Sequence, residues 1–323
     1  MAIHVSDWTL QYFEDVPCPQ SVRIPTADPE CWSWYPRHNW VYNKLQVART
    51  QGLAAAPHGV VPDHFPVFSK PITNLHGMGA GSVLLRNEAE YDRCYAPGHM
   101  WMDLLEGDHV STDVAVVNGE PVWWRHATGL PGGHGMFDYW TIHARPFPAV
   151  EEHCGAWMRQ HLDGYTGMVN LETIGARIIE LHLRFADQWP DLYGGRPWIE
   201  AAVRLYGRGL WQLEEESRRE GYSVVLFGPQ GRRYRHPDPE LRKEIRAMPG
   251  ITSVQITFHE DRAPEWHSNP PGGFRLAIVN CHDLEAGRAA RERLVKAFRL
   301  GHAVNDTRLP RLAASATVTP LKR

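Results

Sequence analysis

The chain has 323 residues, 43% of them hydrophobic, and its 34 lysines and arginines nearly balance its 37 aspartates and glutamates. This balance argues against a nucleic-acid binder held by a general positive field, so we expect small-molecule partners and no nucleic acid. The five cysteines show no spacing typical of a disulfide framework or a zinc site. Neither a signal peptide nor an apolar run of about 18 residues is visible, and we expect a cytoplasmic protein without membrane contact. The sequence leaves open whether it forms a homodimer.

Short strands alternate with capped helices in the first half of the chain. Asn87 is placed to cap a helix, because Glu90 follows at the spacing of a capping box. Alternation of apolar and polar residues around a turn predicts antiparallel strands further on. In chain order the predicted elements are a helix at 40–53, a strand at 65–72, a glycine turn and strand at 76–86, a helix at 87–95, and strands within 100–125 around the turn 117–120.

The second half predicts longer helices and two further strands. Pro197 near a first turn and Gly221 after the end bound one long helix, and Asp238 and Asp283 are typical N-caps of two others. The glycine-rich stretch 130–140 is interpreted either as a mobile loop near a substrate or as an irregular surface loop. The predicted elements are helices at 149–162, 197–220, 238–248 and 283–301, and strands at 251–260 and 274–281. Paired strands with interspersed helices indicate an α+β chain.

Residues 169–185 form the most informative segment. Their odd positions include Val169, Leu171, Ile179, Leu181 and Leu183, whereas their even positions include Asn170, Glu172, Glu180, His182 and Arg184. A three-residue turn over 174–176 predicts a hairpin in which Asn170 lies opposite Glu180, with all the polar side chains on one face. Such a face can bind a hard cation such as Mg²⁺, which substrate phosphates usually complete. The alternative is an ordinary hairpin whose polar side meets water.

Two upstream segments can contact a nucleotide. Lys70 ends an apolar strand, and the loop after it contains Gly77, Gly79 and Gly81, whose backbone N–H groups can approach phosphate oxygens. The alternative is a plain turn with a solvated lysine. Residues 100–116 read as strand, turn and strand, where backbone groups can pair with an adenine edge and Asp103 or Asp108 can lie near the ribose. A plain surface hairpin is the alternative there.

Taken in order, these pieces resemble the ATP-grasp family over roughly residues 40–190. The matching segments are Lys44 in "YNK", Lys70 in "FSKP", the loop "HGMGAGS", the hinge "MDLLEGDH" and the hairpin "GMVNLETIGARIIELHLR". The resemblance implies two α+β subdomains that sandwich the nucleotide, with a C-terminal α/β extension. It divides the chain into a short N-terminal segment (1–43), a lid subdomain (44–103), a core with the metal-binding hairpin (104–190) and a C-terminal part that completes the core (191–323).

The resemblance also implies the reaction and the site. Members of this family typically use ATP and Mg²⁺ to convert a carboxylate into an acyl phosphate, which an amine then displaces. Glu180 matches the strongest metal-ligand position, Asn170 or Glu172 is its partner, and His182 is a further implied metal-site residue. Arg184 and Lys70 are the implied catalytic cations. The implied nucleotide contacts are Lys44, Lys70, His76, Gly77, Gly79, Gly81, Asp103, Leu104, Leu105, Asp108 and His109.

Three features depart from the family pattern. Asp108 and His109 replace the glutamate that usually follows the hinge glycine, His182 stands where asparagine is common, and the segment before Lys44 is short. The leading interpretation is a ligase for a small carboxylic acid and an amine. The alternatives are a nucleotide-binding module with little turnover and a phosphotransferase.

Overall fold

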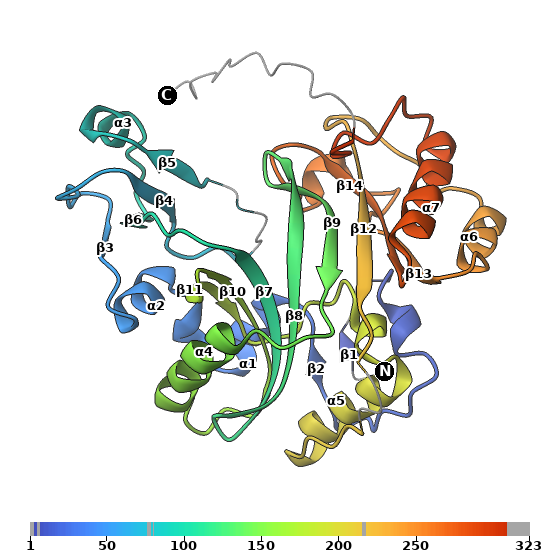
Figure 1. Cartoon of the computed structure of the whole chain (residues 1–323), viewed down its shortest axis with the longest axis horizontal. Coiled ribbons are helices and arrows are strands. Elements are labelled where there is room, and N and C mark those ends of the chain that lie inside the picture. Colours follow the sequence, from blue (N-terminus) through green and yellow to red (C-terminus); the bar gives the residue numbers. More distant parts are fainter. Residues whose placement is uncertain (1–2, 5–6, 76–78, 80, 215–217, 309–323) are drawn as a thin grey trace.

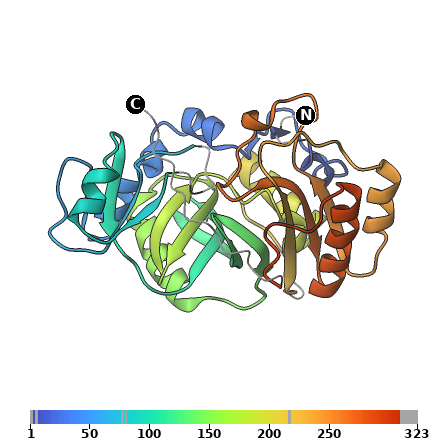
Figure 2. The same ribbon diagram turned by 90° about the horizontal axis from the view of Figure 1, so that it is seen from above.

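The computed structural model describes residues 3–4, 7–75, 79, 81–214 and 218–308 (Figure 1). In this part of the chain the strands form a lid sheet of four strands, a large sheet of eight and a parallel pair. The lid sheet lies at one end of the molecule, and α6 (Pro239–Arg246) and α7 (Leu284–Ala297) lie at the other (Figures 1 and 2). Antiparallel strands with helices packed on them confirm the predicted α+β class.

The lid sheet has the strand order β3-β6-β4-β5 with antiparallel neighbours. Its elements are β3 (Ala55–Pro57), β4 (Val67–Pro71), β5 (Val83–Leu85) and β6 (His99–Asp103), accompanied by α2 (Lys44–Thr50) and α3 (Glu88–Arg93). The predicted cap of α3 is confirmed, since the Asn87 side chain accepts a hydrogen bond from the Glu90 amide at 2.9 Å. Asn43 caps α2 in the same way and so fixes Lys44 in the first helical turn.

The large sheet joins the middle and the end of the chain in the order β11-β10-β7-β8-β9-β12-β14-β13. Its strands are β7 (His109–Val117), β8 (Glu120–Gly133), β9 (Met136–Ile142), β10 (Gly167–Ile174), β11 (Arg177–His182), β12 (Gly221–Gly228), β13 (Ile251–Ile256) and β14 (Phe274–Cys281). Successive residues point to opposite faces. Val114 and Val169 therefore pack with α4 (Pro148–His161), whereas Ala115 and Met168 pack with α5 (Arg196–Arg208).

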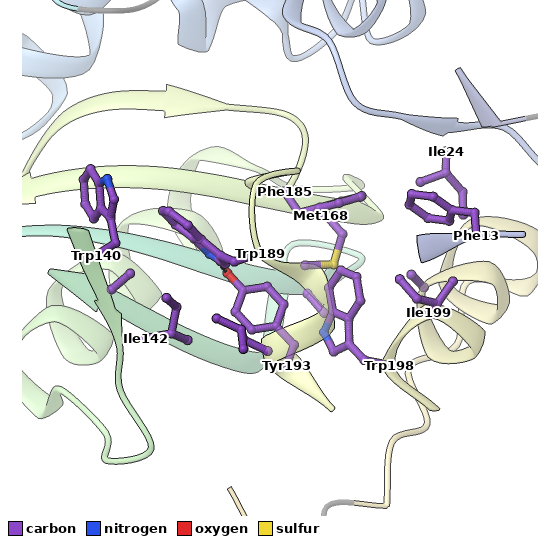
Figure 3. Packing of buried hydrophobic residues seen from close by; sticks show 14 of the residues in the cluster. Phe13, Ile24, Trp140, Ile142, Met168, Phe185, Trp189, Tyr193, Trp198 and Ile199 are labelled. Atoms are coloured by element: carbon purple, nitrogen blue, oxygen red, sulfur yellow. Dashed lines mark hydrogen bonds between the residues drawn. The ribbon is translucent and has the colours of Figure 1, made fainter. Parts of the chain in front are cut away.

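Aromatic side chains fill the core on the α5 side. Trp189, Tyr193 and Trp198 lie together there, with Trp140 at one edge of the group (Figure 3). The Trp189 indole donates a hydrogen bond to the Tyr193 hydroxyl at 2.6 Å. The short 3₁₀ helix η3 (Pro190–Tyr193) supplies Tyr193, and η4 (Pro264–Trp266) lies between β13 and β14 in the chain. This core fixes the chain directly after the β10–β11 hairpin.

The N-terminal segment contains only short elements among its described residues. They are β1 (Ile3–His4), β2 (Ile24–Pro25), the helix α1 (Asp28–Trp34) and the 3₁₀ helices η1 (Leu10–Tyr12) and η2 (Asn39–Tyr42). β1 and β2 pair in parallel, and η2 contacts β11. The segment thus lies on the large sheet instead of forming a separate α/β domain.

Two predicted elements are wrong. The helix expected over 197–220 ends at Arg208, because Gly209 adopts a left-handed conformation with φ of 68°, and Gly221 begins β12 instead of following a helix. The stretch 130–140 is neither a mobile nor an irregular loop but the turn and flanking strands of the β8–β9 hairpin. The domain boundaries at 43, 103 and 190 stay predictions.

Candidate nucleotide and metal site

The β10–β11 hairpin brings two carboxylates face to face. Glu172 lies directly opposite Glu180, and Asn170 lies opposite His182. The predicted pairing of Asn170 with Glu180 is wrong, because the turn has two residues, not three, and a bulge follows Glu172. Gly175 and Ala176 form this turn, both with positive φ, at 55° and 68°. Glu172 and Glu180 still share a face as predicted, because the extra residue at the bulge, Ile179, offsets the shift that the two-residue turn causes.

Each carboxylate already has a cationic or hydrogen-bonding partner. The Lys44 ammonium lies 2.9 Å from Glu180 Oε1, and His109 Nε2 lies 3.1 Å from Glu172 Oε2. Two carboxylates about 5 Å apart repel by about 3 kcal/mol at an effective dielectric of 20, so these partners are needed. Burial alone would raise the pKa of Glu172, but the hydrogen bond and charge of His109 hold it well below the ordinary value. Burial would likewise lower the pKa of His109, and Glu172 raises it instead.

Lys70 enters the site from the lid strand β4. Its ammonium donates a hydrogen bond to the Ile179 carbonyl of β11 at 2.7 Å, and the side chain is buried. Burial and the nearby Lys44 lower the pKa of Lys70 to about 8. The two lysines of the resemblance therefore converge on the same hairpin strand, Lys44 on a side chain and Lys70 on the backbone.

Asn170 is directed into the protein. Its amide donates hydrogen bonds to Asp113 Oδ1 at 2.8 Å and to Ser111 Oγ at 3.1 Å. Asp113 also accepts from the Tyr193 hydroxyl at 2.7 Å and from the Ala186 backbone, and burial raises its pKa to about 6. Asn170 thus links β10 to β7 through buried hydrogen bonds, and Glu172 is the side chain that lies opposite Glu180.

Asp28 is a site residue that the sequence did not reveal. Its Oδ2 lies 3.0 Å from His182 Nδ1 and 3.0 Å from Arg184 Nη2, and its Oδ1 accepts from the Tyr42 hydroxyl at 3.1 Å. Burial would raise the pKa of Asp28, but Arg184 and His182 lower it far below its ordinary value. The other nitrogen of His182 lies 3.7 Å from Glu180 Oε1. An aspartate before a proline reads as a helix start, so no local signal indicated this contact.

The hinge packs on the tip of the hairpin. The Gly175 amide donates to the Asp108 carbonyl at 3.2 Å, and a Cβ on Gly175 would lie 2.3 Å from the Glu106 carbonyl oxygen. Asp103 points back to the lid, where Oδ2 accepts from the Ala54 amide at 3.0 Å and Oδ1 lies 3.1 Å from His64.

The remaining predicted nucleotide contacts differ in what can be said of them. Leu104 is exposed and Leu105 is half-buried in the hinge, and Gly79 and Gly81 both have positive φ. His76 and Gly77 lie outside the described residues.

The donor set suits a hard cation that shares its ligands with phosphates. Among the described residues no group of three or more His, Cys, Asp or Glu side chains is arranged to hold a metal ion by itself. Two opposed carboxylates fit Mg²⁺ nevertheless, because this ion usually takes one or two carboxylates and completes its shell with substrate phosphates and water.

A cavity of about 1440 Å³ is lined by residues outside the hairpin. It lies between β8, η3, α5 and the chain before β12, and residues of both charges line it together with Trp123 and Trp211. None of the predicted site residues lines it. We assign the site from the convergence of charged side chains on the hairpin, and not from this cavity.

Comparison with known proteins identifies the fold. No family model and no curated protein matches the sequence. Among solved structures, the L-amino acid ligase from Bacillus licheniformis aligns with 11% identity over 80% of this chain and 71% of its own, with a TM-score of 0.54. Carboxyaminoimidazole ribonucleotide synthase from Aspergillus clavatus, in complex with ATP, aligns with 10% identity over 81% and 74%, with a TM-score of 0.54.

A third structure is the biotin carboxylase domain dimer of 2-oxoglutarate carboxylase from Hydrogenobacter thermophilus, with MgADP and bicarbonate. It aligns with 15% identity over 84% of this chain and 70% of its own, with a TM-score of 0.52. The chain therefore has the ATP-grasp fold, as predicted. None of its described helices is both long and apolar enough to cross a membrane.

Proposed function

We propose that this protein is an ATP-dependent ligase that activates a small carboxylic acid as an acyl phosphate and joins it to an amine. The observation that supports this most directly is the opposed pair Glu172 and Glu180, with Lys44 and Lys70 reaching the same hairpin from the lid side. Glu172 and Glu180 would hold Mg²⁺, which would neutralise charge on the triphosphate. The ATP and MgADP complexes of the structural neighbours support these cofactors.

The charges of the site suit this chemistry. A carboxylate and a phosphate about 4 Å apart repel by about 4 kcal/mol at an effective dielectric of 20, so the two can react only among cations. Lys44 and Lys70 would bind phosphate oxygens, and Arg184 would lie beside the acyl phosphate. Catalysis would then rest on positioning and electrostatics, without a protein nucleophile.

The test is release of ADP and phosphate that requires an acid and an amine together. Glu172→Gln and Glu180→Gln should each abolish this release, because an amide binds Mg²⁺ much more weakly than a carboxylate. Glu240→Gln, at an exposed position on α6, is the matched control and should behave as the wild type. Release that survives in both hairpin variants would show that the metal assignment is wrong.

One observation favours a second candidate, a nucleotide-binding module with little turnover. Both hairpin carboxylates are paired with protein side chains, Glu180 with Lys44 and Glu172 with His109, so a metal ion must displace or share these contacts. Calorimetry separates the candidates: MgATP binding without product in a broad screen of acids and amines would favour the module. A phosphorylated product without ligation would indicate a phosphotransferase instead.

A further inference from the structure

The carboxylate of Asp28 connects the N-terminal segment to the site. Asp28 lies at the start of α1 and is 5% exposed. Its carboxylate contacts His182 and Arg184, the next two polar residues after Glu180. Asp28 Oδ2 accepts hydrogen bonds from His182 Nδ1 and Arg184 Nη2, each at 3.0 Å. These contacts span more than 150 residues of sequence, 154 for His182 and 156 for Arg184.

Both of the contacted residues need an external anchor. β11 ends at His182, so Arg184 lies beyond the last cross-strand pair and is not held by the ladder. A carboxylate that accepts from one ring nitrogen of a histidine fixes the orientation of the ring and the direction of the other nitrogen. In His182 that other nitrogen is directed toward Glu180, at 3.7 Å. The same aspartate oxygen fixes the guanidinium of Arg184 beside it.

We propose that Asp28 is a positioning residue that holds His182 and Arg184 in the orientation in which they contact the phosphoryl group transferred from ATP. The proposal rests on the proposed function for the identity of that group. The geometry is independent of the proposed function, because Asp28, His182 and Arg184 form one buried hydrogen-bonded unit in the protein alone.

Attachment of the N-terminal segment does not depend on Asp28 alone. The Tyr42 hydroxyl accepts from the Leu183 amide at 3.2 Å, and the Cys31 thiol contacts the Leu183 carbonyl at 3.2 Å. The Tyr42 hydroxyl also donates to Asp28 Oδ1 and its ring lies edge-on to His182, whereas the Cys31 side chain holds α1 to the chain after β11 through the Leu183 carbonyl. A structural anchor and a positioning carboxylate can therefore be separated by choosing which contact to remove.

A competing role predicts the opposite result. If Asp28 only occupied Arg184 in place of a substrate anion, its removal would release the guanidinium and strengthen anion binding. Such a gain would be measured as a fall in the KM for ATP in Asp28→Asn. As a positioning residue, Asp28 instead predicts a loss when it is removed.

The experiment compares Asp28→Asn with Cys31→Ala, which removes an anchor of the N-terminal segment but no bond to Asp28, His182 or Arg184. The first readout is the ¹⁵N NMR signal of the His182 ring, assigned by loss of the signal in His182→Gln. The second is turnover of MgATP with an acid and an amine. We expect Asp28→Asn to remove the hydrogen-bonded Nδ1–H signal and to lower kcat by about tenfold or more, with KM for ATP within about threefold. Cys31→Ala should preserve both readouts even if it lowers Tm.

Each outcome is decisive. An unchanged His182 signal in Asp28→Asn, or faster turnover, would overturn the proposal, as would an equal loss of turnover in Cys31→Ala. Partial recovery of kcat in Asp28→Glu would support it further. If the wild type does not turn over ATP, the proposed function fails, but the NMR comparison still decides whether Asp28 orients His182.

Discussion

Lys70 provides the sharpest test of the electrostatics, because it predicts that removing a buried charge makes the protein more stable. Burial and Lys44 lower the pKa of Lys70 from its ordinary value near 10.5 to about 8. A difference of this size corresponds to about 3 kcal/mol of unfavourable free energy for the protonated form in the folded state. Replacement by methionine removes this cost but also removes the bond to the Ile179 carbonyl, which contributes about 1 kcal/mol. We expect Lys70→Met to be about 2 kcal/mol more stable at pH 7.

The pH dependence follows from the direction of the shift. Below about pH 8, Lys70 is protonated in both states, so the folded protein bears the full cost. Between about pH 8 and about pH 10.5 the folded protein has released this proton while the unfolded chain still binds it, and the stability contributed by this group rises with pH. The advantage of Lys70→Met over the wild type should therefore shrink through this window.

Urea unfolding of both proteins at a series of pH values measures this difference. Lys243→Met is the control, since Lys243 is exposed on α6 and its replacement should change stability little at any pH. A Lys70→Met protein less stable than the wild type at pH 7 would refute the reasoning. It would mean that Glu172 and Glu180 stabilise the ammonium more than burial opposes it.

Two further predictions concern the hairpin. Lys44→Met should cost about 3 kcal/mol because it leaves Glu180 without its cation, and Glu180→Gln added to it should recover most of that loss in a double-mutant cycle of urea unfolding. Independent, additive losses would contradict the pairing. Gly175→Ala should cost about 2–3 kcal/mol through its positive φ and its clash with Glu106, whereas Gly52→Ala, with φ of 73° in open space, should cost only about 1 kcal/mol by the same measurement. An equal loss of stability in both variants would show that the Glu106 carbonyl moves away from a new Cβ at Gly175 without cost.

Alternation within each strand predicted that Asn170 and Glu172 share one face and that Glu180 and His182 share one face. That these two faces coincide depends on the register, because the two-residue turn alone would place Glu172 opposite Ile179, and the bulge after Glu172 brings Glu180 opposite it. The register itself was not predictable, since it depends on a turn one residue shorter and on a bulge after Glu172 that no residue type announces. The order of the motifs along the chain was sufficient to predict the fold, because the fold does not depend on the register of one hairpin.

Contacts distant in sequence were beyond prediction for a different reason. Asp28 carries no local pattern that distinguishes it from a helix-start aspartate, and its partner His182 is 154 residues away. The β8–β9 hairpin was missed because Pro131 and three nearby glycines are unfavourable in strands. One of the interruptions in its register falls between Pro131 and Gly133.

On the proposed function, two departures from the ATP-grasp pattern belong together. Asparagine is common where His182 stands, and it needs no carboxylate to orient it, whereas a buried imidazole does. The N-terminal segment supplies that carboxylate as Asp28, at the start of α1. The same logic applies at the hinge, where His109 provides the partner of Glu172. Changing His182 to asparagine should therefore remove the need for Asp28, so that Asp28→Asn costs turnover in the wild type but little in a His182→Asn background.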